Sequence, residues 1–206
     1  MKYAFRDRFL PAVLPVLTLL AATGAQAQLS TTRGFNLGVY LEGAHLSVED
    51  GDPSGGGGLG LRAGYGVNRI ITLFLNIDGT AIEVDDPDNP SGDWQMAHFD
   101  LGARFHFAST LRRWVPYLEA AFSGRAVSLD DARLGSADLG KLTFSGGALT
   151  IGGGLSIYLK ETLALDIELL ASGGTFNQVD VGAISVSNLD LDATSGRFKL
   201  GLIWWL

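Results

Sequence analysis

Apolar and polar side chains alternate along most of the chain after residue 33, with a period of two residues. Such alternation is typical of β-strands with one apolar and one polar face, because successive side chains of a strand point to opposite sides. The pattern recurs eight times, and within each repeat the apolar face carries no charge. The sequence therefore predicts eight strands, at residues 35–41, 59–67, 71–81, 97–107, 118–126, 149–159, 163–171 and 198–206.

The alternation alone fits either a soluble barrel with an apolar interior or a membrane barrel with an apolar exterior. Two features favour the membrane barrel. Most segments reach the roughly 9 to 11 residues of a tilted membrane span, whereas a soluble strand averages roughly five or six. Short and long connections also alternate strictly, as periplasmic turns and external loops do. The short ones are expected at about 68–69, 108–114 and 160–162, and the long ones at about 49–58, 83–93, 128–144 and 173–195.

The first 27 residues differ from the rest of the chain. They place a basic start, an apolar stretch and a small-x-small cleavage site in the order of a secretory signal peptide. These parts are Lys2, Arg6 and Arg8, then residues 9–22, then Ala25, Gln26 and Ala27. We therefore predict a signal peptide at 1–27, cleaved near Ala27, and one barrel domain at 28–206.

The last eight residues combine a polar residue, a glycine and alternate bulky side chains. They resemble the C-terminal assembly signal of bacterial outer-membrane proteins, with Lys199, Gly201, Trp204 and Leu206 at the matching positions. An aromatic residue is commoner than leucine at the terminus. Together with the signal peptide and the eight segments, the mature chain resembles the small OmpA/OmpX-like outer-membrane β-barrel proteins.

This resemblance implies an all-β, eight-stranded, antiparallel, up-and-down transmembrane β-barrel in the outer membrane of a Gram-negative bacterium. Its expected partners are outer-membrane lipid, lipopolysaccharide and the barrel-assembly machinery. Aromatic girdles are expected at the membrane interfaces. The candidates are Tyr65, Phe105, Phe107, Trp114, Tyr158, Trp204 and Trp205 at the periplasmic end and Trp94 at the external end.

The polar face of the predicted strands carries six acidic and five basic residues. An eight-stranded barrel has an interior just wide enough for side chains to fill, and an unpaired ion there is costly. We therefore predict a plugged lumen with a structural salt-bridge network. Its members are Glu42, Arg62, Asp78, Asp100, Arg104, Glu119, Arg125, Asp166, Glu168, Arg197 and Lys199.

Charge elsewhere is strongly divided. Removing residues 1–27 takes away three basic residues and one acidic residue, which leaves 12 basic and 21 acidic residues and a net charge of −9. The expected long loops hold 14 of these acids with only Arg133 and Lys141. We predict surface interactions through acidic loops, where divalent cations are candidate ligands, and no nucleic-acid partner. The Asp-rich run at 85–93 does not follow EF-hand spacing.

No motif predicts a cofactor or a metal centre, and the absence of cysteine excludes thiol chemistry. The run Gly55 to Gly58 lacks the ending of a phosphate loop and is expected to be a flexible loop. The main prediction is a non-enzymatic protein with a structural or surface-interaction role. One alternative is a lipid A-modifying enzyme that uses His98 and Asp100, which share the inward face. The other is a narrow channel for small solutes.

Overall fold

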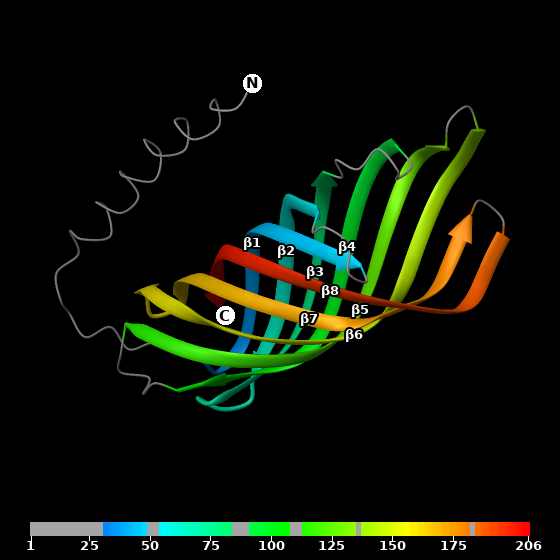
Figure 1. The fold of residues 1–206 in the computed structure, drawn as a ribbon. Coiled ribbons are helices and arrows are strands. Elements are labelled where there is room, and N and C mark those ends of the chain that lie inside the picture. The colour runs from blue at the N-terminus through cyan, green and yellow to red at the C-terminus, as the bar shows by residue number, and fades with distance from the viewer. Residues whose placement is uncertain (1–30, 49–53, 84–90, 108–112, 135–136, 182–183) are drawn as a thin grey trace, which may run out of the picture.

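The computed structural model describes residues 31–48, 54–83, 91–107, 113–134, 137–181 and 184–206. These residues form one closed ring of eight strands, in which each strand pairs antiparallel with the next and β1 pairs with β8 (Figure 1). The strands are β1 (Gly34–Val48), β2 (Ser54–Gly66), β3 (Ile71–Glu83), β4 (Ser91–His106), β5 (Trp114–Leu134), β6 (Ala137–Lys160), β7 (Leu163–Val181) and β8 (Ile184–Trp205). The predicted fold class is therefore confirmed.

The predicted signal peptide lies outside the described residues. Within the described part of the chain, no helix has both the length and the hydropathy to cross a membrane.

The two faces of the ring differ as the alternation predicts. Side chains such as Phe35, Leu61 and Phe122 point outward and are 64%, 63% and 75% exposed. Their neighbours in sequence point inward and are buried, with polar and charged residues in the majority. The apolar face is thus the outer one, which is the arrangement that a hydrocarbon environment requires.

The short turns and the start of the barrel are tied together by hydrogen bonds. In the turn between β2 and β3, Asn68 Oδ1 accepts hydrogen bonds from the backbone N–H groups of Ile70 (2.7 Å) and Ile71 (2.8 Å). Thr31 N donates to Glu161 O (3.2 Å) in the turn between β6 and β7. Thr32 Oγ1 donates to Arg69 O (2.9 Å). The segment before β1 therefore bridges two turns at one end of the barrel.

Three expectations about the opposite end are wrong. The loops expected at 128–144 and 173–195 are mostly strand, because β5 runs to Leu134, β6 starts at Ala137, β7 ends at Val181 and β8 starts at Ile184. Figure 1 shows these long strands rising past the others. The run Gly55 to Gly58 belongs to β2 and pairs with both β1 and β3. The outward apolar side chains form a band around the barrel. Beyond this band both faces of the strands meet water, so apolar and polar residues no longer alternate although the backbones stay paired.

The aromatic prediction is partly wrong. Tyr65, Phe105, Phe107, Trp114 and Trp204 are exposed on the outer face near the short turns. Tyr158 and Trp205 are buried inside the barrel, because each lies one residue away from the outward positions of its strand. Trp94 also packs against buried apolar residues instead of joining an external girdle.

Candidate functional site

The eleven charged residues predicted to face the lumen all lie on the inner face of the barrel, and none is more than 5% exposed. Ten of them form ion pairs with one another. These ten separate into two clusters. The turn-side cluster comprises Arg62, Arg104, Glu119, Asp166 and Glu168, and the middle cluster comprises Glu42, Asp78, Asp100, Arg197 and Lys199.

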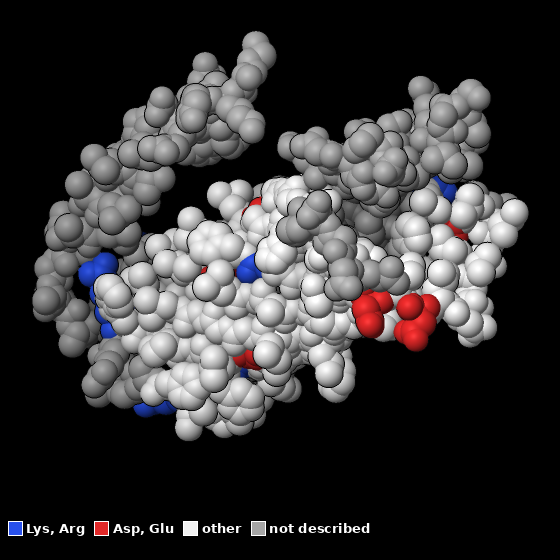
Figure 2. All heavy atoms as spheres, in the orientation of Figure 1, with Lys and Arg blue, Asp and Glu red and all other residues white. Residues whose placement is uncertain are grey.

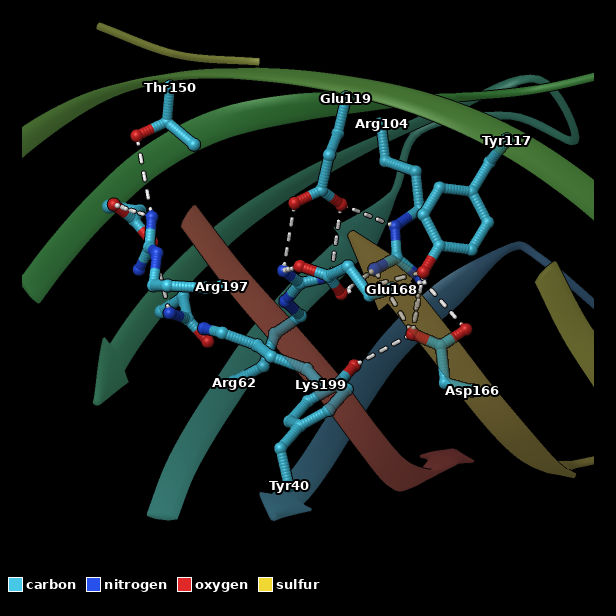
Figure 3. A network of polar contacts seen from close by, with 12 residues as sticks. Tyr40, Arg62, Arg104, Tyr117, Glu119, Thr150, Asp166, Glu168, Arg197 and Lys199 are labelled. Atoms are coloured by element: carbon cyan, nitrogen blue, oxygen red, sulfur yellow. Dashed lines mark hydrogen bonds and ion pairs between the residues drawn. The ribbon is translucent and has the colours of Figure 1, made fainter. Parts of the chain in front are cut away.

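Two arginines hold the turn-side cluster together (Figure 3). Arg104 lies 2.9 Å from Glu119, 3.2 Å from Asp166 and 2.9 Å from Glu168, each measured from a guanidinium nitrogen to a carboxylate oxygen. Arg62 bridges Glu119 (3.1 Å) and Glu168 (2.9 Å) from the other side. Because arginine presents several donors in a fixed plane, each guanidinium can satisfy more than one carboxylate.

Three hydroxyl groups also donate hydrogen bonds to the carboxylate of Asp166. The hydroxyls of Tyr40 and Tyr117 donate to Asp166 Oδ2 at 3.1 and 2.9 Å, and Ser156 Oγ donates to Asp166 Oδ1 at 2.5 Å. The guanidinium carbon of Arg104 also lies 3.6 Å from the centre of the Tyr117 ring. This cation–π contact adds stabilisation, because both side chains are buried.

The middle cluster is organised by Arg197 and Lys199. Arg197 Nη1 lies 2.8 Å from Asp78 and 2.9 Å from Asp100. Lys199 Nζ lies 2.7 Å from Asp78 and 3.2 Å from Glu42. Each cluster thus contains two bases and three acids, so both carry one formal negative charge in excess.

Arg125 is the exception among the eleven. It donates to Ala193 O (3.0 Å) and Ser195 Oγ (3.4 Å), and its guanidinium lies 4.7 Å from the ring centre of Phe176. No carboxylate in the described part of the chain forms an ion pair with it. Arg125 therefore adds one positive charge to the lumen but forms no ion pair with the described carboxylates of either cluster.

The enzyme hypothesis from the sequence pairs His98 with Asp100, but the structure gives these two side chains different partners. Asp100 binds Arg197 and accepts a hydrogen bond from Ser123 Oγ (2.6 Å). His98 Nδ1 lies instead 3.2 Å from Asp78 Oδ1, and His98 Nε2 lies 3.3 Å from Ser195 Oγ. Sequence reasoning missed Ser195, which is 97 residues from His98 and is brought to it only by closure of the ring.

Buried apolar residues lie on both sides of this polar interior. The outer apolar layer comprises Ala44, Leu46, Ile82, Met96, Val127, Phe176 and Ala193. The turn-side apolar layer comprises Tyr40, Val115, Tyr158, Ala164, Ile203 and Trp205. On β4, Met96 lies farther from the short turns than His98, and on β8, Ile203 and Trp205 lie closer to the short turns than Lys199. The charges are therefore enclosed between two apolar layers.

The remaining predicted positions lie at the ends of the barrel. Trp204 and Leu206 of the assembly signal are 60% and 71% exposed on the outer face, whereas Lys199 and Gly201 face inward. His106 is buried, and its Nε2 lies 3.1 Å from Thr72 Oγ1. Among the described residues, no group of three or more His, Asp or Glu side chains could hold a metal ion. Asp85, Asp86 and Asp88 fall outside the described residues.

A family model for the outer membrane protein beta-barrel domain matches residues 13–196 of the chain. The chain belongs to this family. Its barrel therefore lies in the outer membrane of a Gram-negative bacterium, with the short turns at the periplasmic end and the long strands at the external end. No curated protein sequence matches the chain.

Solved structures of small outer-membrane barrels share the fold. Neisserial surface protein A is 21% identical, with a TM-score of 0.63 over 84% of this chain and 97% of that one. OprG from Pseudomonas aeruginosa is 11% identical, with a TM-score of 0.55 over 86% of this chain and 98% of that one. Ail from Yersinia pestis is 11% identical, with a TM-score of 0.53 over 84% of this chain and 100% of that one. At these identities the likeness concerns the fold alone.

Proposed function

We propose that the protein is a closed, non-conducting barrel that serves the outer membrane structurally and meets external partners through an acidic outer end. The observation that carries the closed lumen is the placement of two ion-paired clusters between two buried apolar layers. The side chains of both layers are buried, and no charged residue of either cluster is more than 5% exposed. A narrow channel is less well supported, because a solute would have to separate ion pairs that are almost fully buried.

The outer end supports an interaction with cations. Asp190 and Asp192 are exposed on β8, and Asp180 on β7 pairs with Ser185 farther out on the same ribbon of β7 and β8. The only described basic side chain among these strand ends, Lys141, is already 3.0 Å from Asp130. Ail has been crystallised with the heparin analogue sucrose octasulfate, a polyanion. The carboxylates of the present chain favour the opposite class of ligand, a divalent cation or a cationic partner surface.

Neutralising the described outer carboxylates tests the interaction. We expect Asp180→Asn, Asp190→Asn and Asp192→Asn, combined in one variant, to weaken adsorption of a polylysine probe to vesicles that contain the folded protein. The effect should shrink at high salt, because exposed charges are screened over about 8 Å at physiological ionic strength. Glu161→Gln, at the periplasmic end, is the control. Equal adsorption by parent and triple variant at low salt would remove the role of these residues.

A second candidate function is supported by the row formed by Asp78, His98 and Ser195. Carboxylate, imidazole and hydroxyl stand in the order that activates a serine nucleophile. Ser195 Oγ would attack an ester carbonyl and pass its proton to His98 Nε2, which would return it to the departing alkoxide. Water would then release the acyl group. Arg125, 3.4 Å from Ser195 Oγ, is placed to stabilise the oxyanion. The outer apolar layer beside it favours an uncharged acyl group.

A serine-reactive fluorophosphonate probe distinguishes this candidate from a purely structural role. A catalytic constellation predicts labelling of the folded parent and loss of labelling in Ser195→Ala and His98→Gln. Ser172→Ala is the matched control, because Ser172 is also a buried inward serine but contacts Thr150 and Arg197. A folded parent that stays unlabelled, or one labelled equally with and without Ser195, rejects the enzyme.

A further inference from the structure

Basic residues gather at the periplasmic end of the barrel. Arg33, Arg69 and Lys160 are exposed there, and Arg113 is half-buried. The only acidic residue described among them is Glu161. We call these four basic residues the basic rim. Figure 2 shows basic side chains at one end of the molecule, acidic side chains toward the other and a largely uncharged surface between them.

Backbone contacts hold the basic rim in place. Arg33 directly follows Thr31 and Thr32 in the sequence. Thr32 Oγ1 donates to Arg69 O, and Thr31 N donates to the backbone oxygen of Glu161, the residue after Lys160. Tyr158 N donates to Arg113 O (2.8 Å), and Tyr158 OH donates to Thr31 O (2.5 Å). The basic residues come from four separate parts of the chain, yet these hydrogen bonds fix their backbones relative to one another.

The basic rim lies next to the aromatic girdle of the same end. Trp114 directly follows Arg113 at the start of β5 and is 58% exposed, and Trp204 near the end of β8 is 60% exposed. Phe35 and Tyr65 form an edge-to-face pair with ring centres 4.8 Å apart, close in sequence to Arg33 and Arg69. Exposed aromatic rings of this kind sit at the level of lipid headgroups. The basic side chains just beyond them therefore reach the phosphate level of the inner leaflet.

We propose that the basic rim binds the phosphate headgroups of anionic phospholipids in the inner leaflet of the outer membrane. Arginine and lysine near a membrane surface attract anionic lipid, and guanidinium groups also make paired hydrogen bonds to phosphate oxygens. The acyl chains of the same lipid would lie against the apolar outer face above the girdle. Among the described side chains of the external end the basic one is Lys141, which pairs with Asp130, so we place the binding in the periplasmic leaflet.

Lipid titration of the detergent-solubilised, folded protein by native mass spectrometry tests the proposal. Phosphatidylglycerol is the anionic probe and phosphatidylcholine the zwitterionic comparison. The test variant combines Arg33→Gln, Arg69→Gln and Lys160→Gln. Lys141→Gln, which removes an exposed cation at the external end, is the control. Folding of each variant is checked by the shift in gel mobility on heating, which a closed barrel shows.

We expect the parent and Lys141→Gln to bind phosphatidylglycerol more tightly than phosphatidylcholine. The triple variant should lose roughly a hundredfold of its affinity for phosphatidylglycerol, since each of the three juxtamembrane cations contributes on the order of fivefold. Its affinity for phosphatidylcholine should not change. Equal binding of phosphatidylglycerol by the folded triple variant and the parent would overturn the proposal, as would equal affinity of the parent for the two lipids.

Discussion

At the scale of single residues, two buried arginines illustrate what the lumen requires. Arg104 contacts three carboxylates, whereas the contacts of Arg125 within the described part of the chain are a backbone carbonyl, a hydroxyl and an aromatic ring. Loss of one partner from a buried ion pair leaves an uncompensated charge, at a cost of about 3–5 kcal/mol. Loss of a donor to a neutral acceptor costs about 1–3 kcal/mol.

The two arginines should therefore differ when each is replaced by methionine. We expect Arg104→Met to lower the free energy of unfolding by about 3–5 kcal/mol, because Glu119 and Glu168 then share only Arg62, and Asp166 loses its ion pair. Arg125→Met should lower it by less than about 2 kcal/mol, because no carboxylate loses its partner. Urea unfolding in lipid vesicles measures both. A larger loss for Arg125→Met would mean that ion pairing does not stabilise the interior.

Two glycines on β6 give a second residue-scale prediction. A Cβ at Gly154 would lie 2.2 Å from Ile167 O and 2.3 Å from the Tyr117 hydroxyl, whereas a Cβ at Gly147 meets nothing within 4 Å. Gly154→Ala should displace the hydroxyl that binds Asp166 and cost about 1–3 kcal/mol, as overpacking does. Gly147→Ala should be nearly neutral. Urea unfolding in lipid vesicles measures both variants. Equal losses of unfolding free energy in Gly154→Ala and Gly147→Ala would contradict the crowding at Gly154.

At the scale of elements, the sequence predicts the strands well only where they cross the apolar band. There the outer face must be apolar, so positions such as Leu61 and Phe122 mark the period. In β7 and β8 beyond Gly173 and Ala193 both faces are free to be polar, and the predicted loop is a paired ribbon. Phe74 breaks the pattern in the opposite sense, because this apolar side chain faces inward. The guanidinium carbon of Arg62 lies 4.3 Å from the centre of its ring.

The candidate site is predictable in membership but not in pairing. The period of two places Asp78, His98 and Asp100 on the inner face. Which carboxylate meets the imidazole depends on the stagger of the strands and on contacts across the lumen, and neither is encoded in the spacing within one strand. Ser195 carries no local signal, since serine is common on inward and external positions alike. Only the closed ring brings it to His98.

The division between spanning and protruding parts of the strands can be tested with one substitution at two sites. Ile77 on β3 and Ile184 on β8 are 54% and 68% exposed. We expect Ile77→Arg to destabilise the barrel in bilayers by about 2–4 kcal/mol, because Ile77 faces hydrocarbon near mid-membrane. Ile184→Arg should cost about 0–1 kcal/mol, because Ile184 lies beyond the membrane. Equal costs in vesicle unfolding would contradict the assigned membrane position.

At the scale of the whole molecule, the barrel is ordered along its axis. From the periplasmic end inward come the basic rim, the turn-side apolar layer, the turn-side cluster, the middle cluster and the outer apolar layer, and acidic strand ends follow outside. An ion that crossed would leave water twice at apolar layers and would separate buried ion pairs between them, each step carrying a large desolvation cost. We therefore expect the lumen to be closed to ions.

Electrical recording across planar bilayers measures this closure directly. Barrels are reconstituted from preparations whose gel mobility shifts on heating, and a porin treated in the same way shows that insertion produces current steps under these conditions. We expect no ion current steps from the parent protein at voltages up to about 100 mV, at which an elementary charge gains only about 2.3 kcal/mol from the field. Reproducible current steps from the folded parent would contradict the closed lumen.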